Sequence, residues 1–289
     1  MYTVDNAVIM AAGTSSRFAP LSHEMPKALI TVKGEVLIER QIRQLRQAGI
    51  NDIYIVTGYK SEMFSYLESK LGVHLIHNPD HLTRNNNSSI YAARAVIKNT
   101  YICSADNYFS ENPFEKEVSE SYYAAVYADG ETKEWCMQYG RDGTIQSVHI
   151  GGKNAWYMLG HVFWSEDFSK EFLKILLDSY EKPETADLLW ESIYIKNIEK
   201  LKMKIRKYQN GIIFEFDTLD ELRQFDTSYI NDTRSAIIGN IAKELQCAQG
   251  EITQLNAYKD ETNAASGFTF VCRSEKYKYS YSDGMLRKE

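Results

Sequence analysis

The amino-acid sequence predicts an α/β protein with a Rossmann-like mixed, mainly parallel sheet, helices on both faces, and a small C-terminal α+β appendage. Over the first hundred residues, apolar runs of strand length alternate with stretches of helical periodicity. This order is typical of a parallel sheet that is covered on both faces. Strand-like runs follow one another directly after residue 122, and short antiparallel patterns come after residue 226.

The first half of the chain supplies the parallel part. Strands are expected at 7–10, 53–58, 73–77 and 101–107, with helices between them at 37–48, 62–71 and 88–98. Ligands of such sheets bind beyond the carboxyl ends of the strands. The loop after 7–10 and the carboxylate Asp106 near the end of 101–107 are therefore expected at one edge of the sheet.

The second half is expected to complete a mixed sheet. Its strand-like runs are 122–128, 135–140, 145–150, 157–164, an edge strand in 200–207, and 212–217, and its helical stretches are 167–181 and 186–199. The sequence Arg141–Thr144 (RDGT) is typical of a hairpin turn. The last strand ends in Asp217, and Thr218 is expected to cap the helix that follows.

Two domains are predicted, 1–229 and 230–289, because the strand and helix pattern changes near residue 230. The second contains a helical stretch at 235–245 and strand-like runs at 251–258, 267–272 and 276–282.

Composition excludes several classes of protein. The formal net charge of −6 provides no overall positive field for the phosphates of nucleic acid. No apolar run approaches the roughly 20 residues of a membrane helix, and the N-terminus does not resemble a secretion signal. The four cysteines are scattered and form no CxxC pair, which favours reduced thiols and a cytoplasmic location.

The segment MAAGTSSRFAPLSHEMPKAL, which follows the first strand, has the chemistry of a phosphate-binding loop. It is neither GxxxxGK[ST] nor GxGxxG. Ala11, Ala12 and Gly13 lack bulk, so their backbone N–H groups can approach phosphate oxygens, and Thr14 adds a hydroxyl. Further along the segment, Arg17 and Lys27 supply positive charge. A surface loop that contains these residues by chance is the alternative interpretation.

This segment resembles the signature LAAG-x-G-x-R-x-x-P-L-T-x-x-x-P-K-x-L of the nucleotidyltransferases that make nucleoside-diphosphate sugars and alcohols. Gly13, Arg17 and Lys27 match it, together with Pro20, Leu21, Pro26 and Leu29. The departures are Met10, Ser15 and Ser22, and Ser15 replaces the second glycine of the signature.

Further motifs resemble the bacterial CTP:phosphocholine cytidylyltransferases and the related 2-aminoethylphosphonate cytidylyltransferases. They are GINDIYIVTGY, RNNNSSIYAA, ADNY, KEWCMQYG, ADLLWESIYI and IFEFDTLDEL, in family order within about residues 5–226. The resemblance implies an enzyme that transfers CMP from CTP to a small phosphorylated amino-alcohol, with phosphocholine favoured and 2-aminoethylphosphonate as the alternative. A sugar-phosphate nucleotidyltransferase and a non-catalytic nucleotide-binding regulator are further alternatives.

The same resemblance implies roles for individual residues. CTP is expected to contact Ala11, Ala12, Gly13, Thr14 and Arg17, with Asn86 and Ser89 at the cytosine. Arg17 and Lys27 are expected to offset the charge of the leaving pyrophosphate. The carboxylates of Asp106 and Asp217 are expected to hold Mg²⁺, a hard ion that prefers oxygen ligands. Alone, strand-end aspartates often only cap the next helix.

The acceptor pocket is expected to contain Trp135, Tyr157, Asp187 and Trp190. Aromatic faces attract a quaternary ammonium, and a carboxylate nearby strengthens that attraction. A primary ammonium requires hydrogen-bond acceptors instead. Leu189 stands where the phosphocholine enzymes tend to carry Tyr, which keeps the phosphonate as the alternative acceptor. Burial of the two tryptophans in the core is the plain alternative.

The tail, residues 259–284, resembles the opening of the choline-kinase-like phosphotransferases. Thr262, Asn263, Phe268, Phe270, Lys276 and Tyr277 fit that pattern, and Asp260 stands where Gly is expected. The sequence ends before any kinase catalytic loop, so this segment is expected to be a remnant, a docking module or the stub of a longer fusion. Its apolar, Tyr-rich character would also suit the contact surface of a homodimer.

Overall fold

The computed structural model describes residues 1–259 and 265–289. The tail positions Asp260, Thr262 and Asn263 lie outside the described residues. Contacts between Cα atoms divide the chain into two compact units. We call Met1–Gly13 with Leu37–Glu215 the sheet unit, and Thr14–Val36 with Phe216–Glu289 the loop unit.

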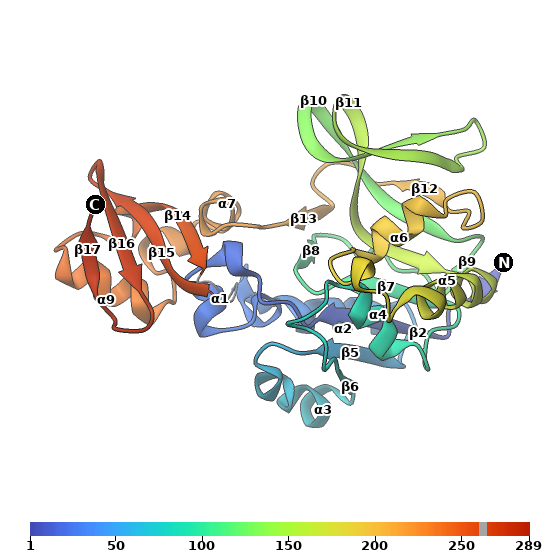
Figure 1. The fold of residues 1–289 in the computed structure, drawn as a ribbon, viewed down its shortest axis with the longest axis horizontal. Coiled ribbons are helices and arrows are strands. Elements are labelled where there is room, and N and C mark those ends of the chain that lie inside the picture. The colour runs from blue at the N-terminus through green and yellow to red at the C-terminus, as the bar shows by residue number, and fades with distance from the viewer. Residues whose placement is uncertain (260–264) are drawn as a thin grey trace. The chain divides into compact units, whose positions relative to one another are not determined.

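The sheet unit is built on a seven-stranded sheet with the order β12-β10-β11-β7-β2-β5-β6 (Figure 1). Four neighbouring strands are parallel, as predicted, namely β7 (Thr100–Ser104), β2 (Asn6–Ala11), β5 (Ile53–Thr57) and β6 (His74–His77). The long strands β10 (Tyr122–Tyr139) and β11 (Ile145–Trp164) pair antiparallel, and the edge strand β12 (Lys204–Lys207) runs parallel to β10. The predicted mixed, mainly parallel sheet is confirmed.

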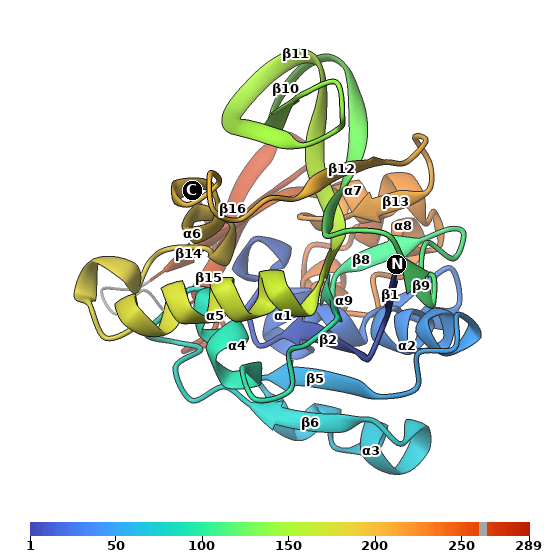
Figure 2. The same cartoon turned by 90° about the vertical axis from the view of Figure 1, so that its right-hand side faces the viewer.

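Helices cover this sheet because their apolar side chains pack on alternate strand residues. Ile90 and Phe172 share one buried cluster with Val8, Val56 and Ile102 of the sheet. Ile90 belongs to α4 (Asn87–Ala93) and Phe172 to α5 (Glu166–Ser179), two neighbouring helices that are visible in Figure 2. The other helices of this unit are α2 (Leu37–Gln47), α3 (Tyr66–Leu71) and α6 (Trp190–Lys196).

Several predicted elements have different bounds. The runs 122–128 and 135–140 form one strand, β10, and 145–150 with 157–164 form β11. Register shifts interrupt their pairing, and the positive φ angles of Gly130 (92°) and Gly151 (80°) lie at two of these shifts. Glycine accepts such angles without a steric penalty, so the hairpin bends without ending.

Smaller corrections concern the strand that leads to Asp106, the bounds of two helices, and short strand pairs that the sequence did not indicate. β7 ends at Ser104, and a turn leads to β8 (Asn107–Phe109), which pairs with β13 (Ile213–Glu215). The predicted helix 88–98 ends at Ala93, and 186–199 is shortened to α6. Two unexpected short pairs are β1 (Tyr2–Thr3) with β9 (Glu117–Val118), and β3 (Thr31–Val32) with β4 (Glu35–Val36).

The loop unit joins the segment after Gly13 to the end of the chain. Its first part contains the short 3₁₀ turns Ser16–Phe18 and Lys27–Leu29 on either side of α1 (Leu21–Glu24). Its second part contains α7 (Leu219–Phe225), α8 (Ser228–Asn231) and α9 (Ala236–Glu244). An antiparallel sheet in sequence order follows, formed by β14 (Ile252–Lys259), β15 (Ala265–Cys272), β16 (Glu275–Ser280) and β17 (Leu286–Lys288).

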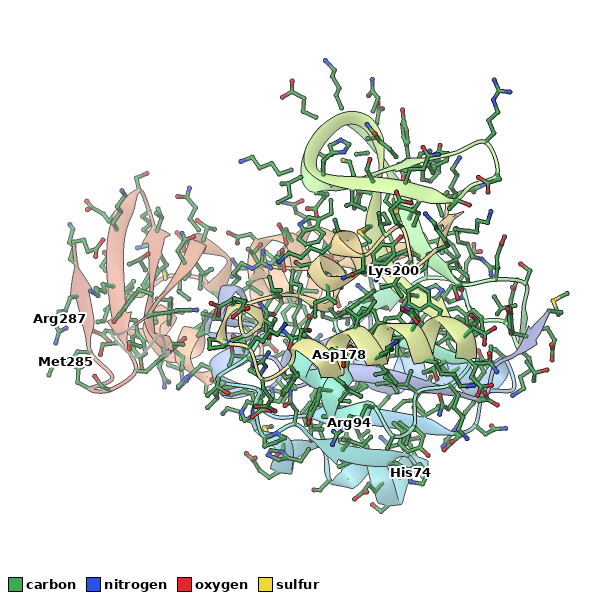
Figure 3. The ribbon with its side chains drawn as sticks, turned by 45° about the vertical axis from the view of Figure 1, so that its right-hand side comes forward. His74, Arg94, Asp178, Lys200, Met285 and Arg287 are labelled. Atoms are coloured by element: carbon green, nitrogen blue, oxygen red, sulfur yellow. The ribbon has the colours of Figure 1, made fainter. Side chains whose placement is uncertain are left out.

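The predicted α+β appendage is thus present. Figure 3 labels Met285, which directly precedes the edge strand β17, and Arg287, which lies in that strand. Its grouping with residues 14–36 was not expected from the sequence. The division into domains 1–229 and 230–289 stays a prediction. No helix in the described part of the chain is long and apolar enough to cross a membrane.

Candidate active site

The signature segment begins at the end of β2. Ala11 and Ala12 are buried, whereas Gly13 and Thr14 are exposed. The carbonyl oxygen of Ala12 accepts a hydrogen bond of 3.1 Å from the backbone N–H of Tyr59. Gly58 permits this approach, because a Cβ there would lie 3.0 Å from that oxygen and 2.5 Å from Cγ of His81. The chain therefore leaves the sheet at a fixed point with accessible backbone at Gly13 and Thr14.

Ser15 adopts a left-handed backbone conformation, with φ 48° and ψ 43°. This is the position at which the nucleotidyltransferase signature carries its second glycine. A Cβ in this region costs about 1 kcal/mol relative to glycine. The geometry of the loop therefore explains the glycine of the signature, and Ser15 keeps that geometry at some cost in stability.

Three predicted catalytic side chains meet within the loop unit. Nη1 of Arg17 lies 2.7 Å from Oδ2 of Asp217, and Nζ of Lys27 lies 3.9 Å from Oδ1 of the same carboxylate. The Arg17 side chain is 75% exposed, whereas that of Lys27 is only 5% exposed. Residues about 200 positions apart in the sequence thus form one group of two cations and one carboxylate.

Asp217 is held in place by the start of α7. Its backbone N–H donates to Oε2 of Glu221 (2.7 Å), and the Thr218 hydroxyl accepts from the Glu221 N–H (3.2 Å). The Thr218 N–H also donates to Oε2 of Glu221 (3.1 Å). The two bonds between Thr218 and Glu221 form a capping box, in which side chain and backbone satisfy each other at a helix start. Thr218 is therefore the helix cap that the sequence predicted, and it fixes the residue beside Asp217.

Asp106 lies in the sheet unit, in the turn between β7 and β8. The buried side chain of Gln41, from α2, donates to the carbonyl oxygens of Ser104 (2.8 Å) and Asn107 (2.9 Å) on either side of this turn. The backbone that carries Asp106 is thereby fixed at the carboxyl end of β7. Because Asp106 and Asp217 belong to different units, their joint role as metal ligands stays a prediction.

The predicted cytosine-reading residues are engaged with other parts of the sheet unit. Oδ1 of Asn86 accepts from the backbone N–H of Trp190 (2.7 Å), and its Nδ2 donates to Oε2 of Glu191 (3.2 Å). The buried hydroxyl of Ser89 accepts from Nδ2 of Asn78 (3.3 Å). These contacts orient both side chains, and base recognition by them stays a prediction.

The predicted acceptor residues differ in accessibility. Trp135 and Tyr157 lie on β10 and β11 and keep part of their surface exposed, and Asp187 is exposed before α6. The Trp190 side chain is only 1% exposed; its ring stacks on Tyr123 with centroids 5.7 Å apart. A ligand could not reach the Trp190 ring in this arrangement, so that ring supports neighbouring groups from within the core.

Sequence reasoning missed a carboxyl group beside these aromatics. Glu191 follows Trp190, and its carboxyl accepts from Asn86 and, at 3.4 Å, from the hydroxyl of Tyr123. Burial raises the pKa of Glu191 to about 7, and the hydrogen bonds from Asn86 and Tyr123 partly oppose that rise. The sequence feature that indicates Glu191 is a carboxylate next to a tryptophan in the motif ADLLWESIYI. Asp187 of the same motif was the predicted pocket residue instead.

Two further carboxylates act on the same aromatic residues. Burial raises the pKa of Tyr157, and the charges of Glu134 and Glu215 add to that rise. Burial likewise raises the pKa of Tyr123 well above its usual range, with Glu191 and Glu215 contributing. Carboxylates from β10, α6 and β13 therefore surround two tyrosines. We call Tyr123, Tyr157, Glu134, Glu191 and Glu215 the acidic aromatic cluster.

A mixed, mainly parallel sheet with the signature loop at the end of β2 agrees with the resemblance to the nucleotidyltransferases. In agreement, residues 7–149 match the MobA-like NTP transferase domain. The structure resembles the glucose-1-phosphate thymidylyltransferase fold from Bacillus anthracis with a TM-score of 0.64 at 16% identity, a likeness of fold alone.

More similar relatives narrow the family. The chain is 33% identical over 226 residues to a choline-phosphate cytidylyltransferase of Streptococcus pneumoniae, covering 78% of this chain and 99% of that protein. It is 36% identical over 234 residues to a 2-aminoethylphosphonate cytidylyltransferase of Lancefieldella rimae, covering 80% of this chain and 95% of that one. The solved structure of the CTP:phosphocholine cytidylyltransferase from S. pneumoniae matches with a TM-score of 0.75 over 78% of this chain and 99% of that chain. The chain belongs to the cytidylyltransferase family.

Proposed function

We propose that this enzyme transfers CMP from CTP to a small phosphorylated amine and releases pyrophosphate. The convergence of Arg17, Lys27 and Asp217 is the observation that carries this proposal. Arg17 and Lys27 match the nucleotidyltransferase signature, and Asp217 belongs to the motif IFEFDTLDEL. Kinship with two cytidylyltransferases of different acceptors supports CTP as the donor.

The reaction needs charge neutralisation more than a protein nucleophile. An oxygen of the acceptor phosphate attacks the α-phosphorus of CTP, and the bond from that phosphorus to the bridging oxygen of pyrophosphate breaks. Both reactants are anions. Arg17 and Lys27 offset the charge that accumulates on the departing pyrophosphate, and the low exposure of Lys27 strengthens its field.

The carboxylates of Asp106 and Asp217 suit a hard divalent cation, because such ions prefer oxygen ligands. We propose that they hold Mg²⁺. When bound, Mg²⁺ supplies positive charge to phosphate oxygens and helps to orient them for in-line displacement. Asp217, which pairs with Arg17 here, would be one of the two carboxylates that hold the ion, and the exposed guanidinium of Arg17 would be available to the triphosphate.

The acidic aromatic cluster supports a cationic acceptor. Trp135 and Tyr157 offer aromatic surface, which attracts a cation by about 0.5–2 kcal/mol per ring. Glu134 and Glu215 supply negative charge near the Tyr157 ring, and Glu215 also acts on Tyr123. A sugar phosphate carries no positive charge, so a cluster of this sign favours an amine.

Phosphocholine is the acceptor that we propose, and 2-aminoethylphosphonate is the second candidate. Leu189, the N-cap residue of α6, stands where an aromatic side chain would favour choline, which keeps the phosphonate as the second candidate. The chain has a relative of each acceptor specificity. Both acceptors carry an anion at one end and a cation at the other, so the cluster alone does not separate them.

The test is pyrophosphate release from CTP with a panel of acceptors. We expect turnover with both amines and a higher kcat/KM for phosphocholine. A preference above tenfold for 2-aminoethylphosphonate would reverse the ranking. Turnover with sugar phosphates alone would identify a sugar-phosphate nucleotidyltransferase, and CTP binding without turnover of any acceptor would identify a regulator.

A further inference from the structure

The C-terminal segment contacts the middle of the signature loop. The loop unit contains both, and Figure 1 shows α1 beside β14 and β15. α1 lies between Arg17 and Lys27 in the sequence. Anything that holds α1 therefore also limits where these two cations can lie.

One contact is an aromatic stack. The rings of His23, on α1, and Tyr281, just after β16, are parallel, with centroids 3.7 Å apart and an interplanar angle of 6°. Aromatic pairs contribute beyond the area that they bury. Tyr281 lies in the tail, whereas the resemblance to cytidylyltransferases covers about residues 5–226.

A second contact uses the start of α9. Oε1 of Glu24 accepts a hydrogen bond of 3.1 Å from the backbone N–H of Ile237. That N–H belongs to the first turn of α9, where backbone donors have no partner within the helix. A carboxylate is favoured there by the positive end of the helix dipole.

A third contact holds the residue after the loop. The carbonyl oxygen of Thr31 accepts from Nη1 of Arg234 (2.7 Å) and from the hydroxyl of the buried Tyr229 (2.7 Å). The guanidinium of Arg234 also lies over the Tyr229 ring, 4.3 Å from its centroid. Residues between 229 and 281 thus contact the signature segment at two successive residues of α1, and they contact Thr31 shortly after its end.

We propose that the segment 232–289 is a built-in support that keeps the signature loop in its CTP-binding conformation, with His23, Glu24 and Tyr281 as positioning residues. None of the three touches the reacting atoms in this role. They act by restricting α1, and through it Arg17 and Lys27. The inference rests on the proposed function, because it concerns the affinity for CTP. Alignment with the S. pneumoniae relative leaves roughly a fifth of this chain unmatched, from the 78% that is covered.

The test compares Tyr281→Ala with the wild-type chain. Loss of the stack should weaken CTP binding about threefold to tenfold, the range that corresponds to an aromatic pair. The KM for the acceptor should change less than twofold. Hydrogen exchange of the backbone at 20–30 should become faster in this variant. Tyr281→Phe keeps the stack and should restore both CTP affinity and protection.

Tyr277→Ala is the matched control. Tyr277 lies on β16 and stacks on Phe270 within the tail sheet, with centroids 5.3 Å apart. Its loss should leave CTP affinity and exchange at 20–30 unchanged. If Tyr281→Ala does not fold, His23→Ala removes the same stack from the other side.

Three results would count against the proposals, and they differ. Unchanged CTP affinity in both Tyr281→Ala and His23→Ala, with a wild-type chain that binds CTP, would overturn the positioning role alone. An equal loss of affinity in Tyr277→Ala would show that general tail stability is responsible, which also overturns it. A wild-type chain that binds no CTP in the same titration would overturn the proposed function first, and the inference with it.

Discussion

At the scale of single residues, the two aspartates carry the sharpest consequence of the proposed mechanism. Asp106 lies in a turn whose backbone is fixed by Gln41, so its replacement leaves those backbone contacts in place and removes the carboxylate. We expect Asp106→Ala to lower kcat at least ~100-fold, the scale on which a transition-state charge stabiliser acts. The measurement is steady-state release of pyrophosphate at saturating CTP and acceptor.

Asp142→Ala is a suitable control, because Asp142 also lies in a turn but on the exposed tip of the β10–β11 hairpin. It should retain wild-type turnover. Activity of Asp106→Ala within threefold of the wild type would exclude a metal-binding role for this carboxylate.

Ser15 offers a test of stability within the signature loop. Because its φ of 48° disfavours any residue with a Cβ, Ser15→Gly should raise the free energy of unfolding by about 0.5–1 kcal/mol. Urea denaturation followed by circular dichroism measures this change. Ser16→Gly, at a neighbouring position with no positive φ, should lower the stability instead. A loss of stability in Ser15→Gly would contradict the left-handed conformation.

Substitution of the two tryptophans should have different effects, one on acceptor binding and the other on stability. Trp135 keeps exposed surface, so Trp135→Ala should raise the acceptor KM, by roughly tenfold for a lost cation–π contact, with CTP affinity unchanged. Trp190 is buried against Tyr123, Trp164 and Phe172, so Trp190→Ala should cost about 3–5 kcal/mol of stability. Kinetics and urea denaturation on the same two variants decide the matter. A selective KM effect in a fully stable Trp190→Ala would place that ring at the ligand.

At the scale of elements, the start of α7 links stability to the candidate site. Thr218→Ala removes the side chain that accepts from the Glu221 N–H and should cost about 1 kcal/mol. Thr218→Ser keeps the oxygen and should restore most of the stability. Thermal unfolding of the three proteins provides the comparison, and equal midpoints would show that the capping box contributes nothing measurable.

Elements with strong local signals were predictable from the sequence. The strands β2 and β5, the helix α2 and the capping residue Thr218 follow from apolar runs, helical spacing and the residue type at a helix start. The bounds of α6 did not follow. The N–H of its first residue, Trp190, donates to Asn86, which lies about a hundred residues earlier, and no local sequence pattern indicates such a partner.

Site residues divide in the same way. Arg17, Lys27 and Asp217 were recognisable because they belong to contiguous motifs, and the structure brings them together. The acidic aromatic cluster was predictable only in part. Glu191 and Glu215 belong to it because of neighbours on other strands and helices, which no local sequence pattern indicates. The contacts of the tail with α1 were not predictable at all, since each joins residues more than 200 positions apart.

At the scale of the whole molecule, the buried His161 and the partly buried Glu191 make opposing contributions to stability as pH changes. His161 is fully buried, and burial together with the charge of Arg206 lowers its pKa to about 3 from 6.5. Nε2 of its ring and the hydroxyl of Tyr122 form a hydrogen bond of 2.9 Å. The pKa of Glu191 is raised to about 7 from 4.5. These two groups therefore favour their neutral forms in the folded protein.

The sign differs between the two groups. Below pH 6.5 the unfolded chain binds a proton at His161 that the folded protein refuses, so this contribution to stability is lost as pH falls from 6.5 toward 3. Between pH 4.5 and 7 the folded protein holds a proton at Glu191 that the unfolded chain has released, so that contribution is lost as pH rises. Between about pH 4.5 and 6.5 the two slopes nearly cancel.

Single variants should expose each slope. Glu191→Gln removes the acid that compensates, so its free energy of unfolding should fall, relative to the wild-type difference, by about 2 kcal/mol between pH 6.5 and 5, at 1.36 kcal/mol per pH unit. His161→Gln should show the opposite trend and gain stability over the same range. Urea denaturation at about pH 5.0, 5.5, 6.0 and 6.5 measures the free energy of unfolding of both variants and of the wild type. Parallel profiles for the wild type and Glu191→Gln would mean that Glu191 is ionised in the folded protein at pH 5.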